Sequence, residues 1–313
     1  MNAILVQAPG LFTTVQDLGR EGFGPMGVSA SGAADPISLR IGNRLVGNPE
    51  GAAALEMTLV GGMFSFERAA IIALTGADFA ASLDGIPLAM WSSIEVQVGQ
   101  TVTLGPSRSG ARAYLCIHGG IAVEPFLGSA STHVLSALGG FEGRALRRGD
   151  RIELGAANSI FYKRWLSPGV LESLRLRKTV RVTDGPQSDW FTNSTWKTFC
   201  ESTFQVSEQS NRMGIRLEGT PIRPDASREM ITEGVSLGAI QVPPSGQPII
   251  LFVEQQTTGG YPKIANVISA DLYSLGQLRP RDTIRFERIK MSEARSLLMQ
   301  QEALLASKEL FQE

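Results

Sequence analysis

The sequence has few of the residues on which several common kinds of site depend. Of its 313 residues only two are histidines and two are cysteines. Two histidines exclude a site built from several of them, and neither His118 nor His133 has the sequence context of a Ser or Cys catalytic triad. Cys116 and Cys200 form no CxxC motif and lie in apolar surroundings. We therefore expect reduced core thiols and no metal site.

Long apolar runs and an excess of charge are also missing. No apolar segment approaches the ~20 residues that a membrane helix needs, and residues 1–10 lack the features of a signal peptide. Lys and Arg total 29 against 30 Asp and Glu, a net charge of -1, so no basic field attracts nucleic acid. We expect a cytoplasmic protein that binds neither nucleic acid nor membranes.

The glycine motifs of nucleotide-binding folds are absent as well. There is no P-loop, and the glycines of residues 19–24 do not open a helix as a Rossmann motif would. The sequence also lacks the Lys flanked by Met residues to which biotin is attached. If ATP or biotin takes part in the function, we expect another chain to help bring it.

The sequence is rich in glycine, with 34 Gly and 16 Pro among many short β-branched runs, which predicts a mostly β chain. We expect few helices: Ile37–Leu45 after an Asp35-Pro36 start, Trp190–Phe199 after Ser188-Asp189, and a C-terminal helix from about Ser292 to Gln312. The expected strands are Ile4–Gln7, Met63–Phe66, Ile71–Leu74, Ser93–Val96, Thr101–Leu104, Ala113–Ile117, Arg151–Leu154, Val180–Thr183, Thr203–Val206, Ile215–Glu218, Ile249–Val253 and Thr283–Phe286.

One arrangement of residues occurs twice along the chain. Segments 110–121 and 246–261 each contain a Gly-led apolar strand, then a polar residue, then Gly-Gly, and similar closing strands follow at 146–154 and 278–286. This pattern predicts two copies of one β-rich unit. With a boundary in 167–178, the expected domains are 1–170, 171–290 and a C-terminal helix at 291–313.

The densest polar stretch is Glu254–Lys263, which directly follows the apolar run Pro248–Val253. It combines a carboxylate, two amides, two hydroxyls, a Gly-Gly pair, a phenol and an amine within ten residues. Such a stretch suits a polar ligand held against exposed backbone N–H groups. A plain hairpin loop is the alternative.

Similar polar and glycine-containing segments extend over the whole chain, and in their order they resemble one family. That family is the biotin-dependent carboxyltransferase domain, also called allophanate hydrolase subunit 2, and its free-standing bacterial members include the C subunit of prokaryotic 5-oxoprolinase. The segments that carry the resemblance are Thr13–Arg20, Gly27–Asp35, Asn43–Asn48, Leu55–Thr58, Leu74–Ala77, Leu127–Thr132, Asp184–Phe191, Ser210–Gly214, Arg228–Val235, Gly238–Pro243 and Glu254–Lys263.

The resemblance implies two cyclophilin-like β-barrels, which agrees with the internal repeat. It also implies a subunit of an ATP-dependent hydrolase, inactive alone, that works with subunits A and B of 5-oxoprolinase to open a small lactam to L-glutamate. ATP with Mg would then act through the complex. Two alternatives stay open: the carboxyltransferase component of a biotin-dependent urea or amide carboxylase, and a regulatory module that antagonises a kinase inhibitor.

The resemblance also suggests candidate site residues, each with a structural alternative. Lys263 and Tyr261 are expected to be catalytic, although a lysine after a proline is often just solvated. His118 and Glu56 complete the catalytic candidates, with a structural role as the alternative for the histidine and a buried, hydrogen-bonded carboxylate for the glutamate. The expected substrate-binding residues are Gln255, Gln256, Thr257, Thr258, Gly259, Gly260, Arg212 and Arg228.

The charged residues Arg212, Arg228, Asp17 and Arg20 have further expected roles. Arg212 and Arg228 can bind an anion, or can pair with nearby acidic residues, for which Asp225, Glu229 and Glu233 are the candidates. We expect Asp17 and Arg20 to form an ion pair that braces a loop rather than touch a substrate.

Overall fold

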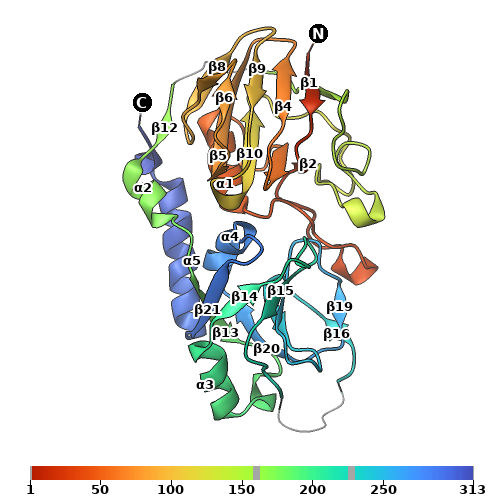
Figure 1. Cartoon of the computed structure of the whole chain (residues 1–313), viewed down its shortest axis with the longest axis vertical. Coiled ribbons are helices and arrows are strands. Elements are labelled where there is room, and N and C mark those ends of the chain that lie inside the picture. Colours follow the sequence, from red (N-terminus) through yellow and green to blue (C-terminus); the bar gives the residue numbers. More distant parts are fainter. Residues whose placement is uncertain (1, 158–162, 225–229, 313) are drawn as a thin grey trace. The chain divides into compact units, whose positions relative to one another are not determined.

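The computed structural model of the chain describes residues 2–157, 163–224 and 230–312 (Figure 1). The chain divides into two compact units. The first unit comprises residues 1–20, 31–175 and 304–313, and the second comprises residues 21–30 and 176–303. The boundary between the two units at residues 175 and 176 lies inside the segment 167–178. The sequence pattern does not indicate that residues 21–30 belong to the second unit or that residues 304–313 belong to the first.

The first unit is built from two antiparallel sheets (Figure 1). Both carry apolar side chains on one face, and these meet in a single core cluster that takes residues from each sheet. The six-stranded sheet has the order β11 (Arg151–Glu153), β1 (Ala3–Ala8), β4 (Met63–Phe66), β9 (Thr101–Thr103), β6 (Ser82–Leu83), β7 (Ile86–Pro87). The five-stranded sheet has the order β2 (Phe12–Gln16), β3 (Ala54–Thr58), β10 (Ser109–Ile117), β5 (Ala70–Asp78), β8 (Ser93–Val96).

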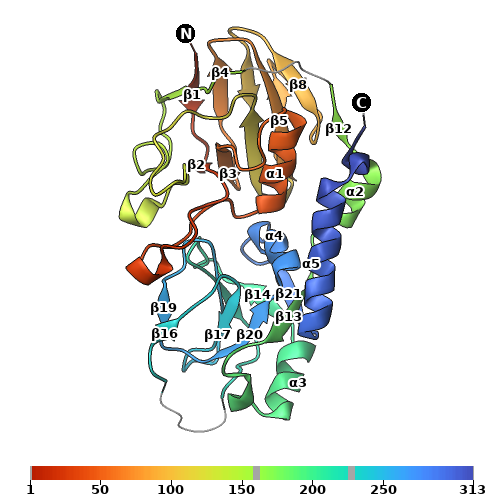
Figure 2. The same ribbon diagram turned by 180° about the vertical axis from the view of Figure 1, so that it is seen from behind.

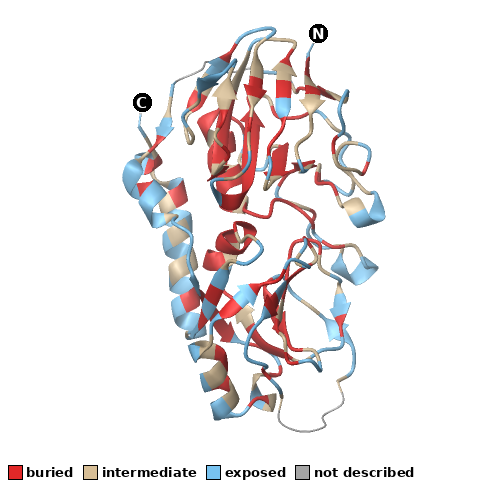
Figure 3. Cartoon of the chain, in the orientation of Figure 1, coloured by how far each residue is buried: buried red, intermediate tan, exposed pale blue. Residues whose placement is uncertain are grey.

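Strand β10 is buried along nearly its whole length because its neighbours cover both edges and α1 (Pro36–Leu45) packs across it and β5 (Figures 2 and 3). Helix α1 begins where the sequence predicts. The Asp35 side chain accepts a hydrogen bond from Ser38 N at 3.0 Å, and Pro36 occupies the first turn, where it needs no donor partner.

The second unit contains a closed barrel of seven strands. All neighbouring pairs are antiparallel except β13 with β21, which run parallel. Aromatic rings fill one end of its core, where Phe199 stacks on Phe286 with ring centroids 4.4 Å apart. The strand order is β13 (Thr179–Asp184), β20 (Lys263–Val267), β17 (Ala239–Gln241), β18 (Ile249–Leu251), β15 (Gly214–Glu218), β14 (Phe204–Val206), β21 (Thr283–Arg288).

The remaining elements are short, apart from one helix. The expected C-terminal helix is present as α5 (Met291–Ala306), but it ends earlier than predicted. The chain then forms β22 (Phe311–Gln312), which pairs with β12 (Trp165–Leu166). The other elements are α2 (Pro168–Ser173), α3 (Asn193–Glu201), α4 (Leu272–Gly276), the pair β16 (Glu233–Gly234) and β19 (Thr258–Gly259), and 3-10 turns at Gly24–Met26, Val134–Ser136, Ser188–Trp190, Ser269–Asp271 and Lys308–Leu310.

The prediction of a mostly β chain with few helices is confirmed, whereas the prediction of two barrels holds in part. Among the described residues, strand pairing closes a barrel in the second unit only, because the first unit's strands divide between two separate sheets. The start of α3 also differs from the prediction. Ser188 and Asp189 begin a 3-10 turn, and the helix is capped instead by Thr192, whose hydroxyl accepts from Thr195 N at 3.1 Å.

The two expected closing strands share one local geometry. Asp150 Oδ2 accepts from Arg147 N at 2.7 Å, and Asp282 Oδ2 accepts from Arg279 N at 2.8 Å, so the same Asp-bonded turn precedes β11 and β21. The Gly-Gly pairs of the repeat do not share a conformation. Gly119 and Gly120 have φ values of 90° and 72°, while residues 259 and 260 lie outside the left-handed region.

Candidate functional site

The polar stretch 254–263 joins two strands of the barrel and forms a short strand of its own. It begins at Glu254, three residues after the end of β18 at Leu251, pairs through β19 with β16, and ends where Lys263 begins β20. Val235 N donates to Thr257 O at 3.1 Å, which extends this pairing by one residue. The stretch is therefore an ordered edge, with part of its backbone already hydrogen-bonded.

Lys263 is buried although the sequence left open that it is solvated. Only 2% of its side chain is exposed, and its Nζ lies 2.8 Å from Glu233 Oε1. Glu233 itself is 44% exposed, so its carboxylate lies between the buried ammonium and solvent. A buried ammonium needs such an anion, since its charge is costly to remove from water.

Gln187 connects these two residues through both ends of its amide. Its Oε1 accepts from the backbone N–H of Lys263 at 3.1 Å, and its Nε2 donates to Glu233 Oε1 at 2.9 Å. A second bond, from Gln187 N to Lys263 O at 3.2 Å, holds the two chain segments together. Because a backbone N–H can only donate, the orientation of the Gln187 amide is fixed.

The two donors affect the titration of Glu233. The hydrogen bond from Lys263, and after it that from Gln187, lowers the pKa of the Glu233 carboxyl below its usual value. Glu233 is therefore ionised at neutral pH, and the cluster consists of an ammonium, an amide donor and a carboxylate.

A pocket of about 340 Å³ lies beside this cluster in the second unit, and its lining is rich in amides. Gln241 is the cross-strand partner of Lys263 and has 2% of its surface exposed. Together with an arginine, a phenol and apolar side chains, these amides suit a small polar ligand with an amide or carboxylate. The polar residues that line the pocket are Asn211, Arg216, Gln241, Ser245, Gln256 and Tyr261.

The structure distributes the other predicted residues of stretch 254–263 along the edge of this pocket. Tyr261 is 43% exposed and lines the pocket with Gln256. Gln255 points elsewhere, since its Nε2 donates to Val235 O at 3.4 Å. Thr258 and Gly260 are exposed, Thr257 is half-buried and Gly259 is buried.

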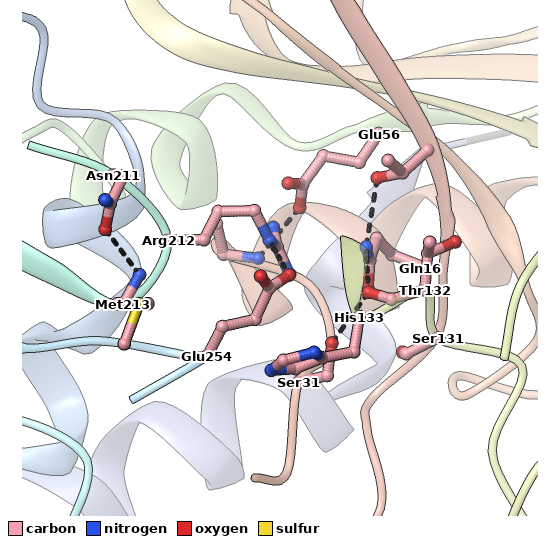
Figure 4. Close-up of polar contacts among 12 residues, drawn as sticks. Gln16, Ser31, Glu56, Ser131, Thr132, His133, Asn211, Arg212, Met213 and Glu254 are labelled. Atoms are coloured by element: carbon pink, nitrogen blue, oxygen red, sulfur yellow. Dashed lines mark hydrogen bonds and ion pairs between the residues drawn. The ribbon is translucent and has the colours of Figure 1, made fainter. Parts of the chain in front are cut away.

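Arg212 is held by an acidic residue that was not among its expected partners. Its Nε bonds to Glu254 Oε1, both side chains are buried, and Glu254 N donates to Arg212 O at 2.8 Å (Figure 4). The Asn211 side chain accepts from Met213 N at 2.8 Å and fixes the same loop. Arg212 therefore braces the start of the polar stretch. Arg228 and its candidate partners Asp225 and Glu229 lie outside the described residues.

In the first unit, Glu56 is the centre of a buried hydrogen-bond network. Its Oε2 accepts from Ala34 N at 2.8 Å and from Tyr114 Oη at 2.7 Å, and its Oε1 lies 3.6 Å from Arg112 Nε. Tyr114 Oη also accepts from Asp35 N at 2.8 Å. Burial, with the charge of Glu56 next, raises the pKa of Tyr114 well above 10, so its hydroxyl stays protonated. This geometry supports a structural carboxylate that fixes the start of α1.

His118 is also anchored in the first unit. Its Nδ1 lies 2.7 Å from Val46 O, and since a carbonyl only accepts, Nδ1 carries the proton. The side chain lines a separate pocket of about 320 Å³ with Arg68 and Glu95.

The loop of residues 126–132 is fastened to the second strand of the first unit. Asp17 accepts from Ser129 Oγ at 2.6 Å and from Ala130 N at 2.6 Å, and Arg20 donates to Phe126 O at 3.3 Å. Gln16 adds a bond to Thr132 O at 3.1 Å (Figure 4). Asp17 and Arg20 thus brace a loop, and the contacts that do so are hydrogen bonds between each residue and the loop rather than the expected ion pair between the two.

The sequence analysis names Lys263 as a site residue and places Gln187, Glu233 and Gln241 in segments that carry the resemblance, but it does not connect them with Lys263, and it offers Glu233 as a partner for an arginine instead. Gln187, Glu233 and Gln241 lie 76, 30 and 22 residues before Lys263, and only the barrel brings them together. The apolar strand β17, which places Gln241 opposite Lys263, was the signal that could have found one of them. Within the described ranges, no group of three or more His, Cys, Asp or Glu side chains is arranged to hold a metal ion, and no helix is both long and apolar enough to cross a bilayer.

The mostly β fold, with its polar edge of amides around a buried lysine, belongs to a known class of domain. The chain is a member of the family described as carboxyltransferase domain, subdomain A and B, which matches residues 26–288. Among curated proteins, it is 42% identical to the C subunit of 5-oxoprolinase from Escherichia coli over 91% of each chain. It is 36% identical to the protein of the same name from Haemophilus influenzae over 93% of each.

More distant similarity extends to much larger proteins. The chain is 34% identical to "Urea amidolyase" of Saccharomyces cerevisiae over 97% of its own length and 18% of that protein's. The crystal structure of the Kluyveromyces lactis urea amidolyase matches with a TM-score of 0.90 at 34% identity, over 97% of this chain and 20% of that one. The chain thus spans about a fifth of the length of these proteins.

Proposed function

We propose that this chain is the C subunit of an ATP-dependent 5-oxoprolinase, which acts with subunits A and B to open the lactam of 5-oxoproline to L-glutamate. The observation that carries the proposal is the 42% identity over 91% of both chains to a free-standing C subunit, so the likeness covers nearly all of each protein. The urea amidolyases match over a similar share of this chain but are more distant in sequence.

The second unit supplies groups that fit such a substrate. 5-Oxoproline has a carboxylate and a lactam amide, and the cluster of Lys263 and Gln187 beside the amide-lined pocket offers donors for both. Lys263 and Gln187 would bind and orient the substrate, and Tyr261 and Gln256 would position it from the pocket edge. Preorganised donors of this kind stabilise the negative charge that develops when an amide is opened.

ATP fits this chain less well than the substrate does. The described residues offer no group of three or more His, Cys, Asp or Glu side chains arranged to hold a metal ion, and the sequence has no phosphate-binding glycine motif. ATP, where it is bound in the assembled enzyme, would supply a phosphoryl group that makes the amide carbon a better electrophile. We therefore assign ATP and Mg to the complex with subunits A and B, in the cytoplasm, and assign this chain to substrate binding.

The division of the chain and the sharing of the site also belong to this proposal. Residues 1–170 and 171–290 would each correspond to one cyclophilin-like unit, with residues 291–313 as a separate C-terminal helical segment. A site shared with the B subunit would leave the chain inactive alone, as the family resemblance implies.

A carboxyltransferase activity is the second candidate, because the chain superposes on a urea amidolyase structure with a TM-score of 0.90. The test is ATP-dependent glutamate release from 5-oxoproline by this chain with its candidate A and B subunits, each omitted in turn. Activity only in the full mixture is expected. A well-formed complex without activity would contradict the proposal, and dependence on a biotin carrier protein would then favour the second candidate.

A further inference from the structure

The Glu233 carboxylate is bound by two donors that would bind the carboxylate of a ligand equally well. We propose that Lys263 Nζ and Gln187 Nε2 form a binding site for a small carboxylate, and that the Glu233 side chain fills this site when the ligand is absent. The identity of the ligand as 5-oxoproline rests on the proposed function, whereas the site itself rests on the geometry below.

The two donors are positioned independently of Glu233. Lys263 is the first residue of barrel strand β20, which fixes its backbone. Gln187 is fixed by its reciprocal bonds to the Lys263 backbone, at 3.1 and 3.2 Å. Both donors reach the same oxygen of Glu233, at 2.8 and 2.9 Å. An oxygen atom at that position therefore lies in ion-pair contact with the Lys263 ammonium and accepts a hydrogen bond from Gln187, whichever molecule carries it.

Glu233 is held much less firmly than its partners. It lies on β16, a strand of two residues, and its side chain is 44% exposed. An ion pair with a partner so exposed contributes little to stability, because water competes for the carboxylate. The Lys263 ammonium, in contrast, is buried and needs an anion. Exchange of one carboxylate for another keeps that ammonium paired, whereas loss of Glu233 alone would not.

The surroundings of the site favour a ligand that combines a carboxylate with an amide. Gln241 is the cross-strand neighbour of Lys263, and it lines the adjacent pocket with Gln256. A carboxylate bound at Lys263 therefore places the rest of a small molecule next to amide side chains, which can both donate to and accept from a lactam.

The experiment measures binding of 5-oxoproline by calorimetry to the full chain and to its assembled complex. 2-Pyrrolidinone, which has the same lactam without the carboxylate, is the control ligand. Because Glu233 competes for the site, Glu233→Ala should strengthen 5-oxoproline binding about three- to tenfold and leave 2-pyrrolidinone binding unchanged. Lys263→Met, which keeps the length of the side chain but not its charge, should weaken 5-oxoproline binding about tenfold or more.

Glu233→Gln provides a second variant if Glu233→Ala does not fold, since it keeps the shape of the side chain and removes its charge. It should also strengthen 5-oxoproline binding, though less. Unchanged or weaker binding of 5-oxoproline in the folded Glu233 variants would overturn the proposal, and so would equal gains for both ligands. The same holds if neither the native protein nor a variant binds 5-oxoproline.

Failure of this site and failure of the proposed function are distinguishable. If the native complex releases glutamate but Glu233→Ala binds 5-oxoproline no more tightly, the proposed function is supported and the proposed carboxylate site is contradicted. A gain in carboxylate binding without any glutamate release would support the site and remove the function.

Discussion

Gly259 lies against the side-chain amide of Gln241, so that a Cβ at residue 259 would come within 2.2 Å of Gln241 Nε2. The same Cβ would lie 3.2 Å from Gln256 Nε2. Gly259 does not adopt a left-handed backbone, and its requirement for glycine is therefore one of space. The first glycine of the Gly-Gly pair is therefore needed to leave room for the side chain of Gln241 from β17.

Gly259→Ala should displace the Gln241 amide and disturb the pocket. Because the colliding atom is the end of a flexible side chain, we expect the protein to fold, with kcat/KM for glutamate release falling about tenfold to a hundredfold. Gly260→Ala is the matched control, since its Cβ would meet only Thr232 Oγ1 at 3.4 Å. Equal activity of the two variants would show that the position of Gln241 does not matter.

Tyr114→Phe should destabilise the first unit without direct effect on the polar stretch of the second. The change leaves the Asp35 N–H and one Glu56 oxygen without the tyrosine hydroxyl, which costs about 1–3 kcal/mol for buried groups. Denaturant unfolding at pH 7 measures this loss. Equal free energies of unfolding for the native protein and Tyr114→Phe would contradict the structural role of this network.

The contribution of Tyr114 should also depend on pH. Its folded pKa lies above the ordinary value of 10.0, so the proton is held more tightly in the folded state. The stabilisation is fully present below pH ~10 and is lost as the pH rises through the folded pKa. The difference in stability between the native protein and Tyr114→Phe should therefore shrink above pH ~10, and a difference that grew there would oppose this assignment.

Arg212→Met should be strongly destabilising, because it leaves the buried Glu254 carboxylate without its partner. Removal of one member of a buried ion pair costs about 3–5 kcal/mol. The double variant Arg212→Met with Glu254→Met should recover most of that loss, since no charge is left buried. Chemical denaturation of both variants measures the effect. If the double variant were as unstable as the single one, the role of Arg212 would lie in contacts other than this pair.

Glu233→Gln tests the ion pair with Lys263 through its dependence on pH. The Glu233 pKa is lowered in the folded protein, so its stabilisation is present above its ordinary pKa of 4.5 and is lost as the pH falls through the folded value. Because the Glu233 side chain is 44% exposed, this stabilisation is small, so the thermal midpoint of the variant should be slightly lower than that of the native protein at pH 7, and the two should converge in acid. Parallel curves from pH 7 to pH 3 would show that the pair does not stabilise the fold.

Much of the β structure follows from the sequence, because strand and turn patterns are local. Every strand expected from an apolar run is present, whereas β2, β3, β17 and β20 were not predicted, and neither were the two-residue strands β6, β7, β12, β16, β19 and β22. Strand β3 contains Glu56, and β20 begins with Lys263, so charged residues interrupt the apolar pattern on which the prediction depends. These are the positions where a buried charge is paired.

The candidate site was predictable only in part, for a related reason. The polar stretch 254–263 could be recognised from its composition. The position of Glu233 next to Lys263, in contrast, depends on the pairing of β16 with β19 and of β17 with β20. These are contacts between distant parts of the chain, and no local pattern encodes them. The buried pairing of Arg212 with Glu254 was missed in the same way, although both residues lie in segments that the sequence singles out.

The pairing of β22 with β12 bears on how the protein is made. Gln312 bonds to Trp165 across 147 residues of chain, and the barrel of the second unit is encoded between these two strands. Strand β22 therefore follows every strand of the barrel in the sequence, the last of which is β21 (Thr283–Arg288), so this edge of the first unit can pair only after the whole barrel has been synthesised. Residues placed directly after Gln312 would therefore continue from a paired strand of the first unit.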